Sequence, residues 1–250
     1  MAQTGTLYRG TFFRHPAQRS ADAIVPVVID LVRPRSVVDI GCGTGTWLAA
    51  FRRHGVPDVF GIDGDWVPRD RLEIPREQFA PHDLSQPLDL GRRFDLAICL
   101  EVAEHLPAAS ADALVALLTR HAPVVLFSAA IPGQGGTGHV NEQWPGYWLD
   151  RFAQRDYLAV DCLRPRFWND DRVEGCYAQN MRLLVSATAL AENEAIRRER
   201  QVEVAFPLDA VHPRVLAARS QNVGLRTLLR MVPSAARRAL ERRLAMRGVA

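Results

Sequence analysis

Two short stretches of the sequence carry carboxylates and imidazoles close together. The first, "EVAEHL", holds Glu101, Glu104 and His105, and the second, "GTGHVNEQW", holds His139 and Glu142. If the first stretch is helical, its three residues share one face at positions i, i+3 and i+4, where they could ligate a divalent metal ion. His139, His105 and Glu142 are also candidate catalytic groups, with His139 as a general base that needs no metal. Both interpretations stay open at this point.

A glycine-rich loop, "DIGCGTGTW", follows the β-like run "SVVDI". Gly41, Gly43 and Gly45 alternate in this loop, and glycine lets a ligand approach the backbone closely. In an open α/β sheet, ligands bind beyond the carboxyl ends of the strands, and an acidic residue about 20 positions later commonly binds ribose hydroxyls. Asp63 occupies that position. The loop departs from the dinucleotide fingerprint, because Thr46 stands where that fingerprint requires glycine or alanine.

Strands and helices alternate along the chain, a pattern typical of a parallel, doubly wound sheet. Apolar residues at helical spacing predict an N-terminal helix over residues 17–32. The sequence then predicts strands at 36–40, 58–63, 94–100, 122–130, 158–163 and 179–187, and helices at 44–55, 110–120 and 147–156. We expect an α/β fold with a Rossmann-like, seven-stranded, mostly parallel sheet, six of whose strands these patterns locate, and an appended helical C-terminal tail. The expected domain covers residues 1–190, and the arginine-rich extension covers residues 191–250.

Four motifs, in order, resemble those of class I S-adenosylmethionine-dependent methyltransferases. They are "VVDIGCGTG", "GIDGDW", "FAPHDL" and "FDLAICLEVAEHL". The resemblance implies that the glycine loop contacts the methionine part of S-adenosylmethionine, that the second motif binds the ribose hydroxyls through Asp63, and that the third contacts the adenine. The cofactor-binding residues that it implies are Asp39, Gly41, Gly43, Gly45, Asp63, Gly64, Asp65, Asp83, Leu84, Leu100 and Glu101.

The E-x-x-E-H order of residues 101–105 also occurs in ubiquinone-pathway O-methyltransferases and in small-RNA 2′-O-methyltransferases. In those enzymes it binds a metal with help from a later histidine, which His139 resembles here. The resemblance therefore implies a metal set of Glu101, Glu104, His105 and His139, holding Mg²⁺ or a similar divalent ion. The same order is widespread in relatives with no established metal, so His139 as a metal-free general base stays the alternative.

The stretch "FSAAIPGQGGTGHVNEQWPGYW" resembles a loop of bacterial methyltransferases encoded with glycan and secondary-metabolite pathways. We expect methylation at oxygen of a small-molecule acceptor, either a carbohydrate or a glycan-linked or secondary metabolite. The aromatic residues in and after this loop suit sugars and bases alike, and an aromatic minicore is the alternative. They are Trp144, Tyr147, Trp148, Phe167 and Trp168.

Three other functions compete with this one. An RNA 2′-O-methyltransferase would use the same motifs, and the arginine-rich tail could be its electrostatic footprint, but no recognised RNA-binding module accompanies the tail. A non-catalytic S-adenosylmethionine-binding protein would bind the cofactor without transferring its methyl group. A nicotinamide oxidoreductase is disfavoured by the glycine spacing and by the absence of lysine from the sequence, which removes the Y-x-x-x-K pair.

Charge is distributed unevenly along the chain. Residues 213–250 hold nine arginines and one glutamate, a local charge of +8, whereas the whole chain carries +3. Within them, "LRTLLRMVPSAARRALERRLAMRG" predicts basic amphipathic helix, which could lie on an anionic membrane surface. The alternative is a helix whose leucines pack on the domain or on a second subunit.

The remaining composition points to the cytoplasm. No apolar run approaches the roughly 20 residues of a membrane-spanning helix, and the N-terminus lacks the apolar stretch of a signal peptide. The four cysteines are widely spaced, which indicates neither a disulfide framework nor a zinc knuckle. We expect a cytoplasmic protein, with the tail as a candidate peripheral contact to the inner face of the membrane.

Overall fold

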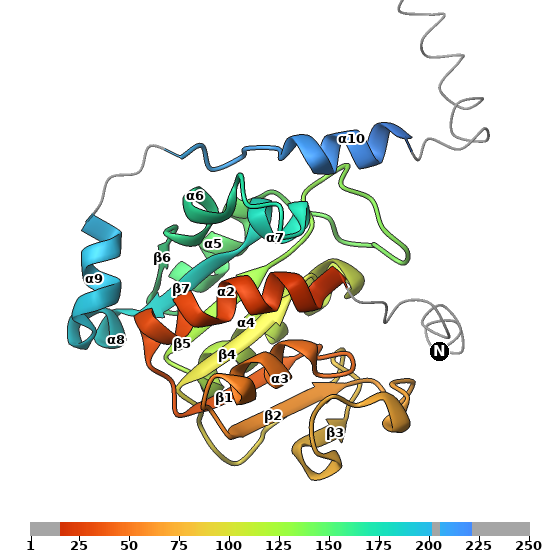
Figure 1. Cartoon of the computed structure of the whole chain (residues 1–250), viewed down its shortest axis with the longest axis vertical. Helices are drawn as coiled ribbons and strands as arrows, with labels where there is room; N and C mark the ends of the chain where they lie inside the picture. The colour runs from red at the N-terminus through yellow and green to blue at the C-terminus, as the bar shows by residue number, and fades with distance from the viewer. Residues whose placement is uncertain (1–15, 202–205, 222–250) are drawn as a thin grey trace, which may run out of the picture. The chain divides into compact units, whose positions relative to one another are not determined.

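The computed structural model describes residues 16–201 and 206–221. Its central feature is a seven-stranded sheet with the strand order β3-β2-β1-β4-β5-β7-β6 (Figure 1). Strands β1 to β5 pair in parallel, whereas β7 is antiparallel to both β5 and β6. The strands are β1 (Ser36–Ile40), β2 (Asp58–Asp63), β3 (Phe79–Pro81), β4 (Leu96–Leu100), β5 (Val124–Ser128), β6 (Tyr157–Val160) and β7 (Arg182–Ser186). The expected seven-stranded, mostly parallel sheet is confirmed.

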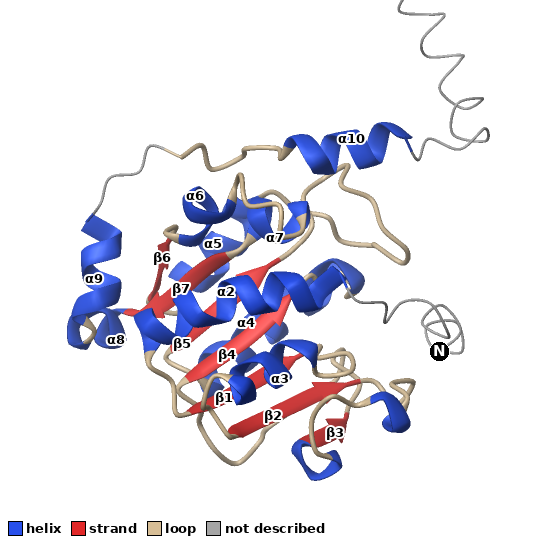
Figure 2. Ribbon diagram, viewed as in Figure 1, coloured by secondary structure: helices blue, strands red, loops and turns tan. Residues whose placement is uncertain are grey.

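Helices cover both faces of this sheet (Figure 2). They are α2 (Pro16–Val32), α3 (Thr46–Arg53), α4 (Ala111–His121), α5 (Pro145–Ala153), α6 (Leu163–Phe167), α7 (Gly175–Asn180), α8 (Ala187–Glu192) and α9 (Glu194–Gln201). A further helix, α10 (Pro213–Gln221), belongs to a second compact unit. Successive strand residues point to opposite faces. Val37 thus joins a core with α2, α3 and α9, and Val38 joins a second core with α4 and α5.

The sequence pattern located most of these elements. The helix expected over 17–32 is α2, and the strand expected over 36–40 is β1. The strand expected over 158–163 ends earlier, at Val160, because the chain turns into α6 from Cys162 onward. Two short helices, α6 and α7, and the three-residue strand β3 were not predicted as elements, since each is too short to show a hydrophobic period.

Packing extends beyond the boundary expected after residue 190. Ile196 of α9 is fully buried in the core that contains α2, and Nδ2 of Asn193 donates to the carbonyl of Leu31 at 2.9 Å. The first compact unit accordingly ends at His212, and residues 213–250 form the second. The composition of the chain changes after residue 190, but α9 still packs on the first unit, and the expected domain boundary stays a prediction.

The second unit is described only over α10. The arginine-rich amphipathic stretch of residues 225–248 lies outside the described residues, so contact with a membrane surface or with a second subunit stays a prediction. Within residues 16–201 and 206–221, no helix combines the length and the apolarity needed to cross a membrane.

The strand order creates the crevice in which a ligand can bind. β1 lies between β2 and β4, so the connections leaving β1 and β4 diverge to opposite sides of the sheet. A crevice therefore opens beyond the carboxyl ends of these two strands. The backbone that leaves β1 is held there by Gly41 and Cys42, whose N–H groups donate to the carbonyl of Ile62 at 2.8 and 3.0 Å.

We predict that Gly41→Ala destabilises the protein more than Gly55→Ala does. Both glycines have a positive φ, 90° and 88°, so alanine strains the backbone equally at both positions, by about 1–2 kcal/mol. At Gly41 the added Cβ would also lie 2.4 Å from Cγ2 of Val102, whereas at Gly55 it would meet no described atom within 4 Å. Overpacking adds about 1–3 kcal/mol at Gly41 only. Urea unfolding of the two ligand-free variants measures the difference, and equal losses would contradict the prediction.

Candidate active site

A cavity of about 1470 Å³ opens at the carboxyl ends of β1 to β4. Loops from all four sequence motifs line it. Its wall includes the predicted cofactor-binding residues Gly41, Gly43, Asp63, Gly64, Asp65, Asp83, Leu84, Leu100 and Glu101. The wall also includes Glu104, His105 and His139, which were predicted as catalytic or metal-binding residues. The fold therefore brings both predicted groups of residues to one cavity.

Three predicted residues are not in this described wall. Asp39 lies in β1 and is 3% exposed; burial raises the pKa of its carboxyl well above the usual value, and the nearby Asp63 raises it further. Gly45 is buried at the start of α3. Glu142 contacts His139, which does line the cavity. In this structure all three support wall residues and do not form the wall themselves.

Asp63 ties the glycine loop to the loop that follows β2. The N–H of Gly43 donates to its Oδ2 at 2.7 Å, and the N–H of Gly64 donates to its Oδ1 at 2.6 Å. Burial raises the pKa of Asp63, and these two hydrogen bonds partly oppose that rise. Each carboxylate oxygen can accept a second hydrogen bond, so Asp63 keeps the capacity to bind a ligand in the cavity.

Sequence reasoning missed a second residue that holds the glycine loop, Glu73. Its Oε1 accepts hydrogen bonds from the hydroxyls of Thr44 at 3.1 Å and Thr46 at 2.5 Å, and its N–H donates to the carbonyl of Thr44 at 2.8 Å. Both threonines line the cavity. The one sequence feature that pointed to this part of the loop was Thr46, the residue that departs from the dinucleotide fingerprint.

The part of the cavity wall that includes the third motif combines the carboxylate of Asp83, the apolar side chain of Leu84 and the indole of Trp66. Asp83 accepts hydrogen bonds at Oδ1 from the hydroxyl and the N–H of Ser85, at 2.7 and 2.9 Å, and these bonds lower the pKa of its carboxyl. Leu84 and Trp66 line the cavity beside it. The indole of Trp66 lies directly against Gly64, where an added Cβ would come within 2.2 Å of the ring. This side of the cavity can accept a planar ring with an exocyclic donor.

The expected helical face over residues 101–105 is wrong. Glu101 has a left-handed backbone conformation, with φ of 55°, and only a 3₁₀ turn, Ala103–His105, follows it. The cause is the end of the neighbouring strand: the N–H of Glu101 donates to the carbonyl and the hydroxyl of Ser128, at 3.0 and 3.1 Å. This pairing turns the chain sharply after β4, so the side chains do not follow helical spacing.

The carboxylate of Glu101 consequently has other partners. It accepts hydrogen bonds from Nε2 of Gln134 at 2.7 Å and from Nδ2 of Asn180 at 3.1 Å. Burial raises its pKa, and the two amide donors oppose that rise. Among the described residues, Glu104, His105 and His139 form a group close enough to share a metal ion, and Glu101 is not part of it. The four-residue metal set stays a prediction.

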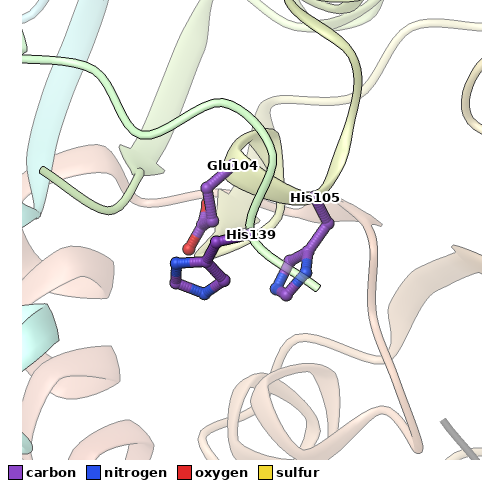
Figure 3. A group of neighbouring side chains, drawn as sticks. All are labelled: Glu104, His105 and His139. Carbon is purple, nitrogen blue, oxygen red and sulfur yellow. The ribbon is translucent and has the colours of Figure 1, made fainter. Parts of the chain in front are cut away.

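Glu104, His105 and His139 converge in the cavity (Figure 3). One potential ligand atom from each lies within 4.8 Å of the others, and the two imidazole rings are perpendicular, with centroids 4.8 Å apart. Neither carboxylate oxygen of Glu104 has a hydrogen-bond partner among the described residues. Burial, followed by repulsion from Glu101, raises the pKa of Glu104 well above its usual value. Burial and then His139 lower the pKa of His105 to about 4.

Glu142 orients the imidazole of His139. Its Oε1 lies 2.9 Å from Nδ1 of His139, and its carboxylate accepts the N–H groups of Gly133 and Gly135 at 2.8 and 2.7 Å. Although burial raises the pKa of Glu142, the hydrogen bonds from His139 and the two glycines hold it below the usual value. The two residues that the sequence proposed separately as catalytic groups therefore form a carboxylate–imidazole pair.

The aromatic residues in and after the acceptor-side loop do not line the described cavity, and they do not form one core, because Trp148 and Phe167 lie in different hydrophobic cores and Trp144 is 43% exposed. Trp148 and Phe167 are buried, and Trp148 packs on Phe127 with ring centroids 5.3 Å apart. Of the five aromatic residues singled out from the sequence, none belongs to the described cavity wall. A shared aromatic minicore is therefore not found among the described residues; Trp148 and Phe167 are instead buried within the two larger hydrophobic cores. A different aromatic residue, Tyr177, does line the cavity.

Comparison with known families identifies a match over most of the chain. Residues 13–182 match the family described as methyltransferase domain, which is more than half of the 250 residues. No curated protein matches the sequence significantly.

Solved structures share the same fold at low sequence identity. A sugar N-methyltransferase from Streptoalloteichus is 19% identical, with a TM-score of 0.52 over 67% of this chain and 87% of that one. A magnesium protoporphyrin IX methyltransferase from Synechocystis, solved with bound S-adenosylmethionine, is 20% identical, with a TM-score of 0.50 over 69% of this chain and 80% of that one. At this identity the likeness shows the Rossmann-like fold of class I methyltransferases.

We predict that Asp63→Ala weakens S-adenosylmethionine binding by about 1–3 kcal/mol, because hydrogen bonds to the ligand and to the glycine loop are both lost. Isothermal titration calorimetry with the purified protein measures the change. Asp70→Ala is the control, since Asp70 is an exposed aspartate that the described cavity wall does not include. Unchanged affinity in Asp63→Ala would contradict the assignment of this carboxylate to the cofactor site.

Proposed function

Because the chain belongs to the methyltransferase domain family, we propose that it methylates a hydroxyl group of a small-molecule acceptor, with S-adenosylmethionine as the methyl donor. The acceptor we infer is a carbohydrate or a glycan-linked or secondary metabolite. The observation that carries the proposal is the His139–Glu142 pair beside the cavity, because a hydroxyl needs a base before it can attack a sulfonium methyl group.

The cofactor would occupy the half of the cavity formed by the ends of β1, β2 and β3. In this placement the glycine loop contacts the methionine moiety, Asp63 the ribose, and Asp83 and Leu84 the adenine. The carboxyl group of Asp63 lines this half of the cavity, where its ionised form would complement the positively charged sulfonium. The free hydrogen-bonding capacity of Asp63 supports the ribose assignment.

Methyl transfer then requires one proton to leave the acceptor. The acceptor oxygen forms a bond to the methyl carbon while the bond from that carbon to sulfur breaks, which leaves S-adenosylhomocysteine. The hydroxyl proton passes to Nε2 of His139, because Nδ1 is already engaged with Glu142. Glu142, held by two backbone N–H groups, stabilises the imidazolium that forms.

Three observations support a carbohydrate-like acceptor. The acceptor-side loop resembles that of methyltransferases encoded with glycan pathways, and one protein of similar fold is described as a sugar N-methyltransferase. The wall near His139 also mixes polar and apolar side chains, among them Gln134, Val140 and Leu106. Such a surface suits a ligand with hydroxyl groups and apolar ring faces.

A second candidate mechanism uses a divalent metal, and Glu104 favours it. A buried carboxylate without a hydrogen-bond donor is costly unless a cation neutralises it. Glu104, His105 and His139 supply one oxygen and two nitrogen ligands, a set that suits Mn²⁺, Fe²⁺ or Zn²⁺ better than Mg²⁺. A bound metal would act as a Lewis acid on the acceptor hydroxyl. His139 would then be a ligand, with Glu142 fixing its ring, and would not serve as the base.

We predict that His139→Ala and Glu142→Gln lower the rate of methyl transfer by about 10²- to 10⁴-fold and leave S-adenosylmethionine affinity almost unchanged. The rate is measured with methyl-labelled cofactor and the best acceptor from a screen of sugars and glycosides. His54→Ala is the matched control, because His54 is an exposed histidine outside the described cavity wall. Full activity in both variants would rule out the pair as the base.

We predict that turnover survives exhaustive chelation if His139 is the base. Loss of turnover, with recovery on adding Mn²⁺ or Zn²⁺, would instead establish the metal mechanism. Thermal unfolding gives a readout independent of activity: a bound metal raises the Tm of the wild-type protein but not that of Glu104→Gln. Without metal, Glu104→Gln is expected to raise the Tm, since it removes a buried carboxylate that has no donor among the described residues.

A further inference from the structure

Residues 206–212, which we call the strap, lie beyond the family match yet are fastened to the domain. Arg164 of α6 donates to the carbonyls of Pro207 at 3.1 Å and Leu208 at 3.3 Å. Arg182, the first residue of β7, donates to the carbonyl of Leu208 at 2.9 Å. Both arginines are almost fully buried. The strap therefore covers two guanidinium groups. Without the strap, these groups would face solvent or would lack some of their hydrogen-bond acceptors.

The strap supplies part of the hydrogen-bond acceptors of the two arginines, which also donate to the carbonyls of Gln179 at 3.5 Å and Asn180 at 3.0 Å. Asp161 pairs with both, through Nε of Arg164 at 2.9 Å and Nε of Arg182 at 3.7 Å. Burial and then repulsion from Arg164 lower the pKa of Arg182 to about 10. Each guanidinium has five N–H donors, more than one shared carboxylate can satisfy. The strap carbonyls supply further acceptors, and leaving buried donors unpaired would be costly.

The strap ends at His212, which contacts the site side of the domain. The main-chain N–H of His212 donates to Oε1 of Gln179 in α7 at 2.8 Å, and its Nε2 lies 2.7 Å from the carbonyl of Trp168. Gln179 is 1% exposed, so its amide has little access to water. A main-chain N–H can only donate, so this contact fixes the amide of Gln179 with its oxygen toward the strap and its nitrogen away from it.

The orientation of the Gln179 amide determines how two further side-chain amides, those of Gln134 and Asn180, face Glu101. Nε2 of Gln179 donates to Oε1 of Gln134 at 3.1 Å and to Oδ1 of Asn180 at 2.9 Å. Because their oxygens face Gln179, the nitrogens of Gln134 and Asn180 face Glu101 and donate to its two carboxylate oxygens. If Gln179 turned over, its oxygen would face two other oxygens, and one of the amides would have to present an oxygen to the carboxylate.

The same chain of amides reaches the acceptor side of the cavity. Gln134 lies in the loop between Gly133 and Gly135, whose N–H groups hold Glu142 against His139. The orientation of Gln134 therefore affects both Glu101 and the loop that carries His139.

We propose that Gln179 is a positioning residue that couples the strap to the active site: one strap N–H sets the amide orientations that hold Glu101 and the acceptor-side loop. The strap is then part of the functional site, although it lies outside residues 13–182. The inference rests on the proposed function only in taking the cavity as the S-adenosylmethionine site.

The test compares full-length variants, first without ligand. Gln179→Glu keeps an oxygen for the strap N–H but replaces the NH₂ donor with an acceptor. We expect the side-chain NH₂ resonances of Gln134 and Asn180 in ¹⁵N NMR spectra to shift and to exchange faster. S-adenosylmethionine affinity should fall about tenfold, in line with the loss of one charge-assisted hydrogen bond. Gln154→Glu, at an exposed position, controls for the added charge.

A second pair of variants tests the strap itself. His212→Pro removes the N–H and should reproduce the changes at Gln134 and Asn180, whereas His212→Ala keeps the N–H and should leave both resonances in place. Unchanged resonances and affinity in a folded Gln179→Glu protein, or identical spectra for the Pro and Ala variants, would overturn the inference. If the wild-type protein bound no S-adenosylmethionine, the proposed function would fail, and the ligand-free NMR spectra would still decide the role of the strap.

Discussion

The need to pair carboxylates taken out of water determines much of this site. A buried or half-buried anion is tolerated when hydrogen-bond donors surround it. Asp63 receives two glycine N–H groups, Glu142 receives two glycine N–H groups and an imidazole, and Glu101 receives two side-chain amides. The positive-φ turns at the strand ends and in the loop over residues 131–142 are the backbone conformations that aim these N–H groups. The backbone conformations of these loops are thus suited to the carboxylates that they bind.

Glu104 does not follow this pattern, and this difference is relevant to both candidate mechanisms, the one with a metal ion and the one with His139 as the base. Burial and the charge of Glu101 both oppose its ionisation, and the nearby backbone N–H groups of Glu104 and Ala130 offset this only in part, since neither carboxylate oxygen forms a hydrogen bond with a described residue. A protein keeps an unfavourably buried carboxylate of this kind where its function requires the group. A divalent ion bound to Glu104 would permanently remove the free-energy cost of burying the carboxylate. An imidazolium formed at His139 during methyl transfer would remove it transiently, since Glu104 then faces a cation in the transition state that is absent from the ground state.

Most residues that the local sequence motifs assign to the cofactor line one cavity, because a parallel sheet collects the residues after its strands at one edge. Their role in binding the cofactor stays a prediction. Glu101 shows where such reasoning fails: its spacing to Glu104 suggested a helix, but hydrogen bonds to Ser128, 27 residues away, impose a left-handed turn. Gln134 and Asn180 reach Glu101 across 33 and 79 residues. Contacts of that kind leave no periodicity in the sequence, so neither amide could be found before the fold was known.

The two halves of the site also differ in how they can change. On the cofactor side the donors to Asp63 are backbone N–H groups, which most substitutions preserve. Around Glu101 the donors are side chains, and their orientation depends on Gln179 and on the N–H of His212. A single substitution there can reverse an amide, because the donors to Glu101 are side chains and not backbone N–H groups. The region around Glu101 is therefore where a single substitution can most directly alter the site.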